Sequence, residues 1–435
     1  MVVLQLVDYV GIILTIVALA AVLPERASRV VTLSGITAML IFTVILPRGS
    51  VYSYEGLGLV QVVEGYKAAG ILLLTLELLV LLSFIRDIDR RNGPLLILMS
   101  AGSLLVLYSE SFITLIVGLE TAAVALAALY SVGEDRATEA AIKYFYSSML
   151  GVAFIVLAAA LFYNNGIHDF SELDSNVNIL NSHTNLLLGL VFLVAGLSLE
   201  AGLAPFYMWL PDVVEGAGLL SVAVALLLLD ASVTLKLLHL IASVGTATSI
   251  TLIMLVMAVA SMFIGEFSAL AQNGVRRMLG YSIVGGAGYK VILALALALA
   301  GRSTLTPIVY LVTASSMSVA LVVASQYYQD TPCGKIAEVV GLLSMAGIPP
   351  LYGFAAKLIM LMTIISAGCI WIALATIAFF LVAASYIIRY MLSSSFKVKK
   401  NSSLESIPLV IYAVLVFVLG IWPQVIDVLE VINIG

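Results

Sequence analysis

Ionisable side chains occur inside long apolar segments of this chain, where a charge is costly. Glu200 lies deep in an apolar run that begins near Leu186, and Lys357 lies in a second run. A charge at the centre of a bilayer costs at least ~2.5–3.5 kcal/mol, so such groups face protein, a partner charge or water. Burial moves the pKa values of carboxylic acids and amines toward neutrality, where both can exchange protons. These residues therefore indicate a polar path through an apolar protein.

Prolines interrupt both of these apolar runs. Pro205 and Pro211 follow Glu200, while Pro349 and Pro350 precede Lys357. Because proline lacks a backbone donor and clashes with the preceding turn, we expect each run to form a broken helix. Lipid cannot pair the freed backbone groups, so protein or water must cover them. Two interrupted helices at matching places in two halves of a chain indicate an ion or substrate route near the midplane.

Further ionisable residues at membrane depth extend the candidate path. The complete set of candidate proton-carrying residues is Glu120, Lys143, Glu200, Asp230, Lys236, Lys290 and Lys357. Asp230 and Lys236 differ by six positions, roughly 9 Å of rise and 120° of rotation on a helix, so they are separate sites. Glu77 is also buried in an apolar run, and Glu266 lies nearer the end of one. The alternative interpretation is that some of these charges pair merely to hold helices together.

The composition predicts a polytopic membrane protein. Of 435 residues, 62% are hydrophobic and 10% are charged, and the mean hydropathy is +1.16. Soluble domains of this size do not have such a composition. The N-terminal run lacks a basic segment before it, so we expect a first membrane span there and not a signal peptide.

About fourteen segments have the length and apolarity of membrane spans. The predicted spans are 6–23, 30–46, 68–86, 94–109, 111–131, 139–163, 184–209 (broken), 217–243, 247–269, 274–299, 304–327, 337–368 (broken), 370–393 and 406–430. The connecting loops are short, apart from 47–66 and 164–183, which leaves no room for a second, soluble domain. The fold class that we predict is an all-α polytopic membrane protein.

The distribution of basic residues predicts the orientation of the chain in the membrane. Loops after odd-numbered spans carry 12 lysines and arginines, whereas loops after even-numbered spans carry 3, namely Arg48, Lys67 and Arg302. Because basic loops stay in the cytoplasm, both termini are expected outside.

Residues that could hold a redox centre are scarce. The chain has two cysteines, Cys333 and Cys369, and an iron–sulfur cluster needs four. A haem ligated by His168, His183 or His239 has no supporting pattern. We therefore expect no cofactor and no metal in this chain, and any electron transfer would take place in another subunit.

Five stretches resemble the antiporter-like membrane subunits of respiratory complex I, and subunit N most of all. They are GLE at 118–120, EAAIKYF at 139–145, GLAPFYMWLPDVVEGA at 202–217, RRMLGYSIVGGAGY at 276–289 and LLSMAGIPPLYGFAAK at 342–357. They occur in the family's order over about 240 residues, which makes the match to the family specific.

The resemblance implies a fold and a role. It implies two inverted five-helix repeats, spans 4–8 and 9–13, in which spans 7 and 12 are broken. The predicted units are a three-helix segment (1–93), a first repeat (94–243), a second repeat (247–393) and a C-terminal helix (394–435). By the same resemblance the chain binds no redox centre and moves protons along the membrane plane. Other membrane subunits and a peripheral quinone-reducing arm would be its partners, in the cell membrane and without nucleic acid.

The functional residues of the family match this chain at some positions and differ from it at others. Glu120 matches the glutamate of the fifth span, Lys143 the lysine of the sixth, and Lys357 the lysine of the twelfth. Where the family has lysines in its seventh and eighth spans, this chain has Glu200 and Asp230. We therefore expect Glu200→Gln to be better tolerated than Glu120→Gln.

The resemblance also implies that each repeat offers a half-channel for protons, and three interpretations of the first half-channel stay open. Glu120 and Glu200 could share one proton and titrate as a coupled pair. Paired carboxylates beside a broken helix could instead favour Na⁺, or this half could be structural. The function that we predict is a proton-translocating subunit of a complex I-like quinone oxidoreductase. The alternative is a subunit of a multi-subunit monovalent cation/proton antiporter or of a membrane-bound hydrogenase.

Overall fold

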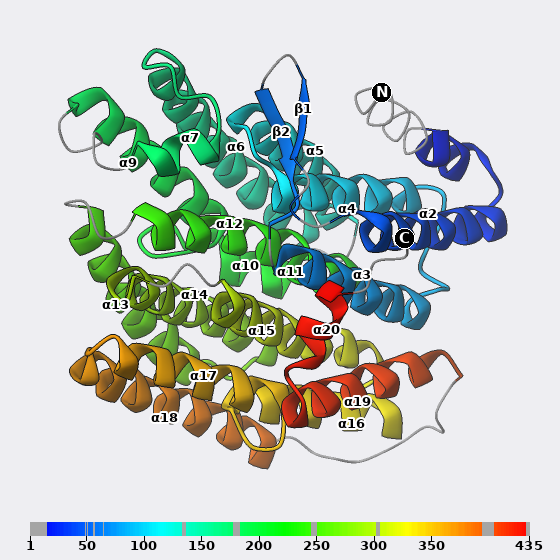
Figure 1. Ribbon diagram of the computed structural model, residues 1–435. Coiled ribbons are helices and arrows are strands. Elements are labelled where there is room, and N and C mark those ends of the chain that lie inside the picture. The colour runs from blue at the N-terminus through cyan, green and yellow to red at the C-terminus, as the bar shows by residue number, and fades with distance from the viewer. Residues whose placement is uncertain are drawn as a thin grey trace.

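Helices of membrane length make up most of the chain, and they lie side by side (Figure 1). This computed structural model describes residues 15–47, 49, 51–54, 57–63, 65–132, 136–176, 183–244, 250–301, 305–393 and 404–431. The first half contains α2 (Glu25–Ile45), β1 (Val51–Tyr54), β2 (Leu57–Gln61), α3 (Tyr66–Ser83), α4 (Asn92–Tyr108), α5 (Phe112–Tyr130), α6 (Ala137–Tyr163), α7 (Phe170–Ser175), α9 (Thr184–Glu200) and α10 (Trp209–Gly216).

The second half continues with helices alone. Its elements are α11 (Leu219–Leu227), α12 (Leu229–Val244), α13 (Ile250–Leu270), α14 (Val275–Leu299), α15 (Thr306–Ser325), η1 (Gln326–Tyr328), α16 (Pro332–Ala346), α17 (Tyr352–Ser366), α18 (Ile370–Ser393), η2 (Leu404–Ser406), α19 (Ile407–Ile421) and α20 (Val425–Val431).

The helix lengths confirm the predicted fold class. Within the described residues, 10 helical segments are long and apolar enough to cross a membrane, and α4, α9 and α17 are shorter apolar helices. The span count of fourteen stays a prediction, because half of the expected first span, 6–23, lies outside the described residues. The boundaries of the two repeats stay a prediction as well.

Three expected boundaries differ from the structure. The loop 47–66 contains an antiparallel hairpin, in which Val51 pairs with Gln61. The expected span 217–243 corresponds to one membrane-length segment, Leu219–Val244, which has a local irregularity at Leu228 between α11 and α12. The last span ends at Ile421 instead of residue 430, because Pro423 cannot continue a helix and α20 starts anew to pack on α3.

Burial separates central helices from peripheral ones. In the most apolar 18-residue stretch of each helix, the buried share is 94% for α15 and 83% for α14 but 28% for α18. In Figure 1 α14 and α15 lie between α6 and α9 on one side and α17 and α18 on the other. A helix that is apolar all round and buried belongs to the core of a bundle, while exposed apolar faces such as that of α18 suit lipid or a partner.

Capping residues fix the start of α16, the helix that leads into the second break. The side chain of Thr331 accepts a hydrogen bond from the backbone N–H of Gly334, and Pro332 occupies the first position of α16. These are typical N-terminal residues, because a side-chain oxygen pairs an orphan donor and proline has none to lose.

The two broken helices end in the same way. Gly202 after α9 and Gly347 after α16 have φ of 64° and 77°, a left-handed conformation that favours glycine. In each case the next residue donates its N–H to the carbonyl five positions earlier, Leu203 to Ser198 and Ile348 to Leu343. Three residues after each glycine comes a proline, Pro205 or Pro350, that follows a cis peptide bond. The expected breaks are therefore confirmed and share one construction.

The remaining two prolines have different places at these breaks. Pro349 lies in the gap between α16 and α17. Pro211 lies in the first turn of α10, so it begins the second half of its broken helix and does not interrupt it.

Candidate functional site

Glu200 lies at the first break, as the last residue of α9. Its side chain is buried, and its Oε1 accepts a hydrogen bond of 2.5 Å from the hydroxyl of Ser148 on α6. α6 and α9 pack closely here, because a Cβ on Gly151 would lie 3.3 Å from Glu200 Oε1. Glycine thus leaves room for the carboxyl group between the two helices.

A small cavity connects Glu200 with Asp230. It has a volume of about 20 Å³, and its walls include Tyr130, Tyr144 and Trp209 besides the two acids. A cavity needs about 10–15 Å³ to hold one water molecule, so this one has room for a single water. We call it the first cavity. It brings together the two acids that stand where the family resemblance placed bases.

Glu120 lies beside this cavity without lining it. Its side chain on α5 is partly buried and makes no hydrogen bond to the described residues. It is close enough to Glu200 to interact with it electrostatically. Two carboxylates so placed repel each other when both are ionised.

Asp230 leads from the first cavity to the neighbouring helix. It lies in the first turn of α12, and its Oδ2 is 3.8 Å from the Nζ of Lys290 on α14. The side chain of Lys290 is 3% exposed and that of Asp230 is 15% exposed. An acid and a base that the sequence left unpaired therefore form a buried salt bridge.

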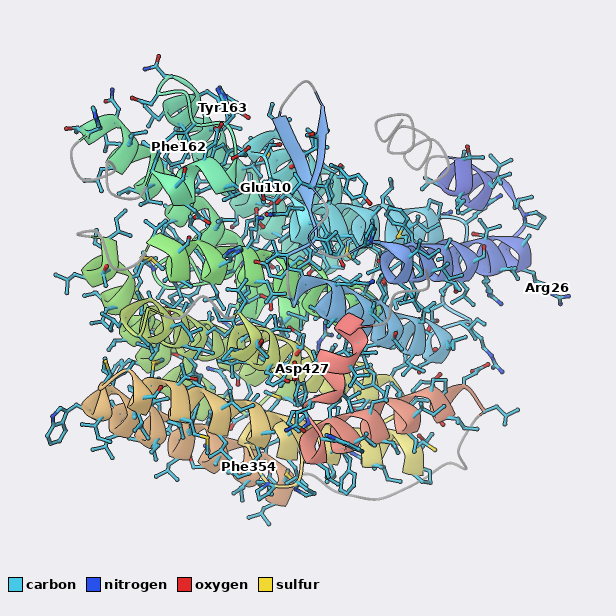
Figure 2. All side chains as sticks on the ribbon, in the orientation of Figure 1. Arg26, Glu110, Phe162, Tyr163, Phe354 and Asp427 are labelled. Carbon is cyan, nitrogen blue, oxygen red and sulfur yellow. The ribbon has the colours of Figure 1, made fainter. Side chains whose placement is uncertain are left out.

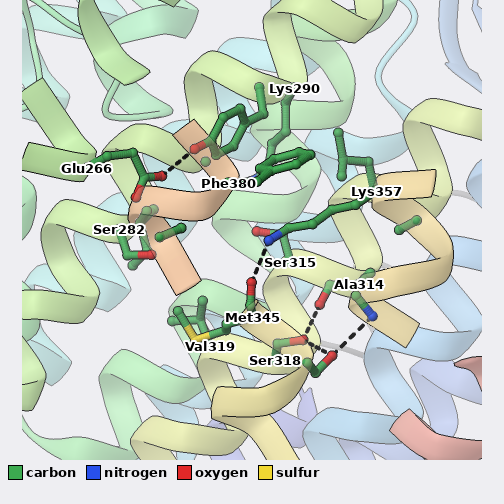
Figure 3. Close-up of a pocket in the computed structure, with 18 residues that line it drawn as sticks. Glu266, Ser282, Lys290, Ala314, Ser315, Ser318, Val319, Met345, Lys357 and Phe380 are labelled. Atoms are coloured by element: carbon green, nitrogen blue, oxygen red, sulfur yellow. Dashed lines mark hydrogen bonds between the residues drawn. The ribbon is translucent and has the colours of Figure 1, made fainter. Parts of the chain in front are cut away.

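A second cavity is lined by Lys290 of this pair (Figure 3). Its volume is about 70 Å³, and its walls include Glu266, Tyr289, Lys290, Lys357 and Phe380. This volume is enough for several water molecules. Figure 3 shows Glu266 and Lys357 entering from opposite sides, from α13 and α17. The sequence predicted Lys290 and Lys357 as members of one path, and the structure places both on this cavity.

Hydrogen bonds fix the polar walls of the second cavity. Tyr289 donates its hydroxyl to Glu266 Oε1 at 2.7 Å, and Lys357 Nζ donates to the carbonyl of Met345 at 2.6 Å. The ammonium also lies 4.5 Å from the centre of the Phe380 ring, a cation–π distance. The positive charge of Lys357 is thus held by a carbonyl dipole and an aromatic face.

Lys143 lies apart from this line of buried groups. Its Nζ is 2.6 Å from both Asp212 Oδ2 and Glu139 Oε1, and its side chain is 40% exposed. Asp212 also pairs with Arg277 at 3.1 Å, which joins the start of α6 to α10 and to the start of α14. The lysine that the sequence placed on the path therefore belongs to an ion-pair network near the bundle surface.

Lys236 belongs to another polar cluster, although it shares α12 with Asp230. Its Nζ donates to the carbonyl of Ser109 and lies 4.3 Å from the centre of the Phe170 ring. Neither the first nor the second cavity is lined by Lys236. Two acids interact with it electrostatically. Glu110 lies in the connection before α5, and Asp174 lies within α7.

Glu110 anchors this cluster beneath the hairpin (Figure 2). Its backbone N–H bonds to the carbonyl of Leu59 in β2, and its carboxyl accepts from the backbone and hydroxyl of Ser171. Burial raises the pKa of Glu110 and of Asp174, and the positive charge of Lys236 partly offsets this rise in both. Lys236, Glu110 and Asp174 thus form a mixed-charge cluster at the end of the bundle.

A wide vestibule opens at the bundle end where α10 meets α11. It has a volume of about 660 Å³, and charged residues such as Asp87, Arg136 and Glu215 line it. The segment 216–221 borders the vestibule, and its neighbours Val214 and Val222 line the first cavity. The vestibule therefore lies close along the chain to the residues that line the first cavity.

Two residues that lie at the helix breaks or cavities, Glu266 and Ser148, are outside the set of candidates that the sequence predicts. Glu266 was set aside because it lies near the end of its span, yet it faces Lys357 across the second cavity. The glycines of α14 were the available hint in the sequence. Gly285 leaves room for the carboxyl group, since a Cβ on Gly285 would lie 2.5 Å from Glu266 Oε1. Ser148 had no such signal, because a serine in an apolar helix predicts nothing about its partner.

Side chains that commonly bind metal ions were compared in the described part of the chain. There, no group of three or more histidine, cysteine or carboxylate side chains is placed to hold a metal ion.

Comparison with known proteins connects this geometry to a family. The family of transmembrane subunits described as NADH:quinone oxidoreductase/Mrp antiporter matches residues 109–382, which contain both breaks and every residue that lines the two cavities except Ala383. The NADH-quinone oxidoreductase subunit N of Herminiimonas arsenicoxydans is 30% identical over 66% of this chain and 64% of its own length. That of Neisseria gonorrhoeae is 32% identical over 64% and 62%. The chain thus spans less than two thirds of the length of these curated relatives.

Solved structures share the fold over almost the whole chain. A chain of respiratory complex I from Thermus thermophilus has a TM-score of 0.80 at 23% identity, covering 97% of this chain and 100% of that one. A chain of the archaeal membrane-bound sulfane sulfur reductase has a TM-score of 0.82 at 19% identity, covering 97% and 94%. A chain of the Mrp complex from Dietzia has a TM-score of 0.77 at 16% identity, covering 97% and 91%.

The matched residues, the shared architecture and the motifs around both helix breaks agree, and they confirm the resemblance found in the sequence. This chain belongs to the family of transmembrane NADH:quinone oxidoreductase/Mrp antiporter subunits.

Proposed function

We propose that this chain translocates protons as a membrane subunit of a complex I-like quinone oxidoreductase. The observation that carries the proposal is the line of buried ionisable groups between the two helix breaks. Glu200 at the first break and Lys357 at the second each line a cavity, and the Asp230–Lys290 pair stands between them. Proton transfer needs such groups within reach of one another, directly or through one water.

The redox chemistry belongs to partner subunits in this proposal. The relatives are named as subunits of NADH-quinone oxidoreductase, and the similar solved chains come from multi-subunit membrane complexes. The partners would be further membrane subunits and, through them, a peripheral redox arm. The chain would lie in the cell membrane with its termini outside, and it would hold no cofactor of its own.

The main rival is an antiporter or hydrogenase-type complex, since the Mrp complex shares the fold. The test is to purify the chain with its associated subunits from native membranes and to identify them by mass spectrometry. The same complex in vesicles is then assayed for proton uptake with NADH, reduced ferredoxin or hydrogen as donor and a short-chain quinone as acceptor. Quinone-dependent proton uptake supports the proposal. Proton movement that requires a Na⁺ gradient, or ion exchange by the isolated chain, contradicts it.

A further inference from the structure

The vestibule where α10 meets α11 lies outside the line of groups that runs from Glu200 to Lys357. α3, α5 and α10 end beside it, and α4, α6, α11 and α14 begin there. Because the ends of membrane helices lie at the depth of the lipid headgroups, the vestibule opens at that depth whichever way the chain is inserted. Its volume of about 660 Å³ falls within the range of roughly 300–1,000 Å³ that small-molecule pockets have. The vestibule therefore has the size and the position to hold a headgroup.

Positively charged and polarised groups line one part of the vestibule. The Nη1 of Arg136 is 3.5 Å from Glu215 Oε2, whereas the Nη1 of Arg277 is 2.7 Å from the same oxygen. Glu215 is thus paired mainly with Arg277, and the side chain of Arg136 is 70% exposed. α11 begins at the vestibule after Gly218, which provides no side-chain cap for the first N–H groups of the helix. An arginine beside an uncapped helix start favours a phosphate group.

The connection between α3 and α4 brings negative charge to the same space through Asp87 and Asp89. Asp87 Oδ1 accepts a hydrogen bond of 3.3 Å from the hydroxyl of Tyr327. Asp89 Oδ1 accepts from the backbone N–H groups of Arg91 and Asn92. Within the described part of the chain, the second oxygen of each carboxylate accepts no hydrogen bond. A primary ammonium group, with its three N–H donors, matches these two oxygens.

The charges that line the vestibule are balanced. Once Glu215 is assigned to Arg277, the remaining charged residues of the lining are two bases and two acids, namely Arg136, Arg276, Asp87 and Asp89. A ligand that carries only a negative charge would leave the acids without a partner and would be repelled by them. A ligand with one phosphate and one ammonium group complements both parts of the lining.

Apolar side chains complete the lining. They lie at the end of α3, at the end of α5 and at the start of α11, and they are Phe84, Leu129, Val132, Leu219 and Leu220. Val132 is 52% exposed, so this part of the vestibule opens to the surroundings of the bundle. A small water-soluble zwitterion has no apolar part to bury there. The glycerol ester and first acyl carbons of a phospholipid would gain free energy from this contact.

We propose that the vestibule binds the headgroup of an ethanolamine phospholipid. Its phosphate would contact Arg136 and the start of α11, and its ammonium group would contact Asp87 and Asp89. A choline headgroup has no N–H donor for the two acids, and a glycerol headgroup has no positive charge. This inference is independent of the ion that the chain moves and of its redox partners, so it stands or fails apart from the proposed function.

The test uses the assembled complex that contains this chain, reconstituted in phosphatidylcholine vesicles. These vesicles contain a small fraction of phosphatidylethanolamine with a photoreactive diazirine next to its glycerol ester. After illumination, mass spectrometry of peptides locates the label. The competitors are unlabelled phosphatidylethanolamine, phosphatidylglycerol, soluble O-phosphoethanolamine and inorganic phosphate.

Two variants remove one charge each from the vestibule, Arg136→Gln and Asp87→Asn. Arg90→Gln and Glu25→Gln are the matched controls, because both residues are exposed and neither lines the vestibule. Native gels report how much of each variant assembles.

We expect the label in segments 84–92 and 215–221 of the wild-type chain, and competition by unlabelled phosphatidylethanolamine alone. Each vestibule variant should lower this labelling about tenfold, because each loses a charged hydrogen-bonding partner of the headgroup. Both controls should label like wild type.

Four results would overturn the proposal. Wild-type labelling in the assembled Arg136→Gln and Asp87→Asn variants would show that the charges do not select the ligand. Equal competition by phosphatidylglycerol would remove the role of the acids. Displacement by O-phosphoethanolamine or phosphate would assign the site to a soluble ligand. A wild-type complex without label in these segments would mean that a partner subunit fills the vestibule. Should a variant fail to assemble, the competition series on the wild-type complex decides.

Discussion

Lys357 donates a hydrogen bond of 2.6 Å to the carbonyl oxygen of Met345, across the break between α16 and α17. Such carbonyls at a helix end have no helical partner. At the first break, the carbonyl of Leu199 accepts instead from the indole N–H of Trp209 at 3.1 Å. An indole keeps its proton, whereas an ammonium group can release one. The backbone of the second break is therefore bonded to an ionisable side chain, and that of the first is bonded to an indole.

The surroundings of Glu120 and Glu200 lead us to predict the opposite of the order of tolerance expected from the sequence. Glu200 is buried, bonded to Ser148 and on the first cavity, whereas Glu120 is partly buried beside it. We predict that Glu200→Gln lowers proton uptake by the vesicle-bound complex about tenfold or more, and that Glu120→Gln has a smaller effect. Uptake that suffers more from Glu120→Gln would restore the order expected from the sequence.

Close packing across the second break makes Gly353 sensitive to any side chain. A Cβ there would collide with the backbone carbonyl of Ser344, which also accepts a hydrogen bond from the N–H of Gly347. We predict that Gly353→Ala lowers the free energy of unfolding by about 1–3 kcal/mol, as overpacking does. The measurement is the thermal midpoint of the purified complex.

Gly286→Ala is the matched control for this packing effect. Gly286 lines the same cavity, but its Cβ would meet nothing closer than the Ser315 hydroxyl at 3.9 Å. Its thermal midpoint should stay near wild type. Equal midpoints for Gly353→Ala and wild type would show that the two halves of the broken helix are not packed as described.

Lys236 should control the titration of the cluster beneath the hairpin. Burial raises the pKa of Glu110, and the Lys236 charge opposes part of that rise. Lys236→Met removes the opposing charge, so the pKa of Glu110 should rise further and its carboxyl should stay protonated to higher pH. Infrared titration of the carboxyl band measures this, and Glu110→Gln identifies the band. A band that titrates at the same pH in both proteins would mean that Lys236 carries no charge there.

Sequence reasoning located the helix breaks because proline and glycine act locally. The positions of Pro205 and Pro350 and the apolar runs around them suffice to predict an interruption. The buried acids and lysines were identifiable for a similar reason, since any charge in an apolar run is costly. Both arguments depend on residue type and on distance along the chain, which the sequence contains.

Contacts between helices could not be predicted in this way. The sequence predicts Lys143 and Lys236 as members of the path, but it could not predict their partners, which are Asp212 for Lys143 and the carbonyl of Ser109 for Lys236. In the sequence, Asp230 is an acid at a position where the family has a lysine, and Lys290 is an additional base without an evident partner. Their pairing depends on how α12 and α14 face each other, which is set by tertiary packing and not by the pattern of either helix.

The most direct test of the proposed proton path is Lys357→Met in the assembled complex, with quinone reduction and proton uptake measured side by side. Lys335→Met is the control, because Lys335 lies on the neighbouring α16 and lines neither cavity. We predict normal assembly with proton uptake lowered about tenfold or more, or turnover lowered equally where the two are tightly coupled. An unchanged proton-to-electron ratio at unchanged turnover would contradict the path through Lys357.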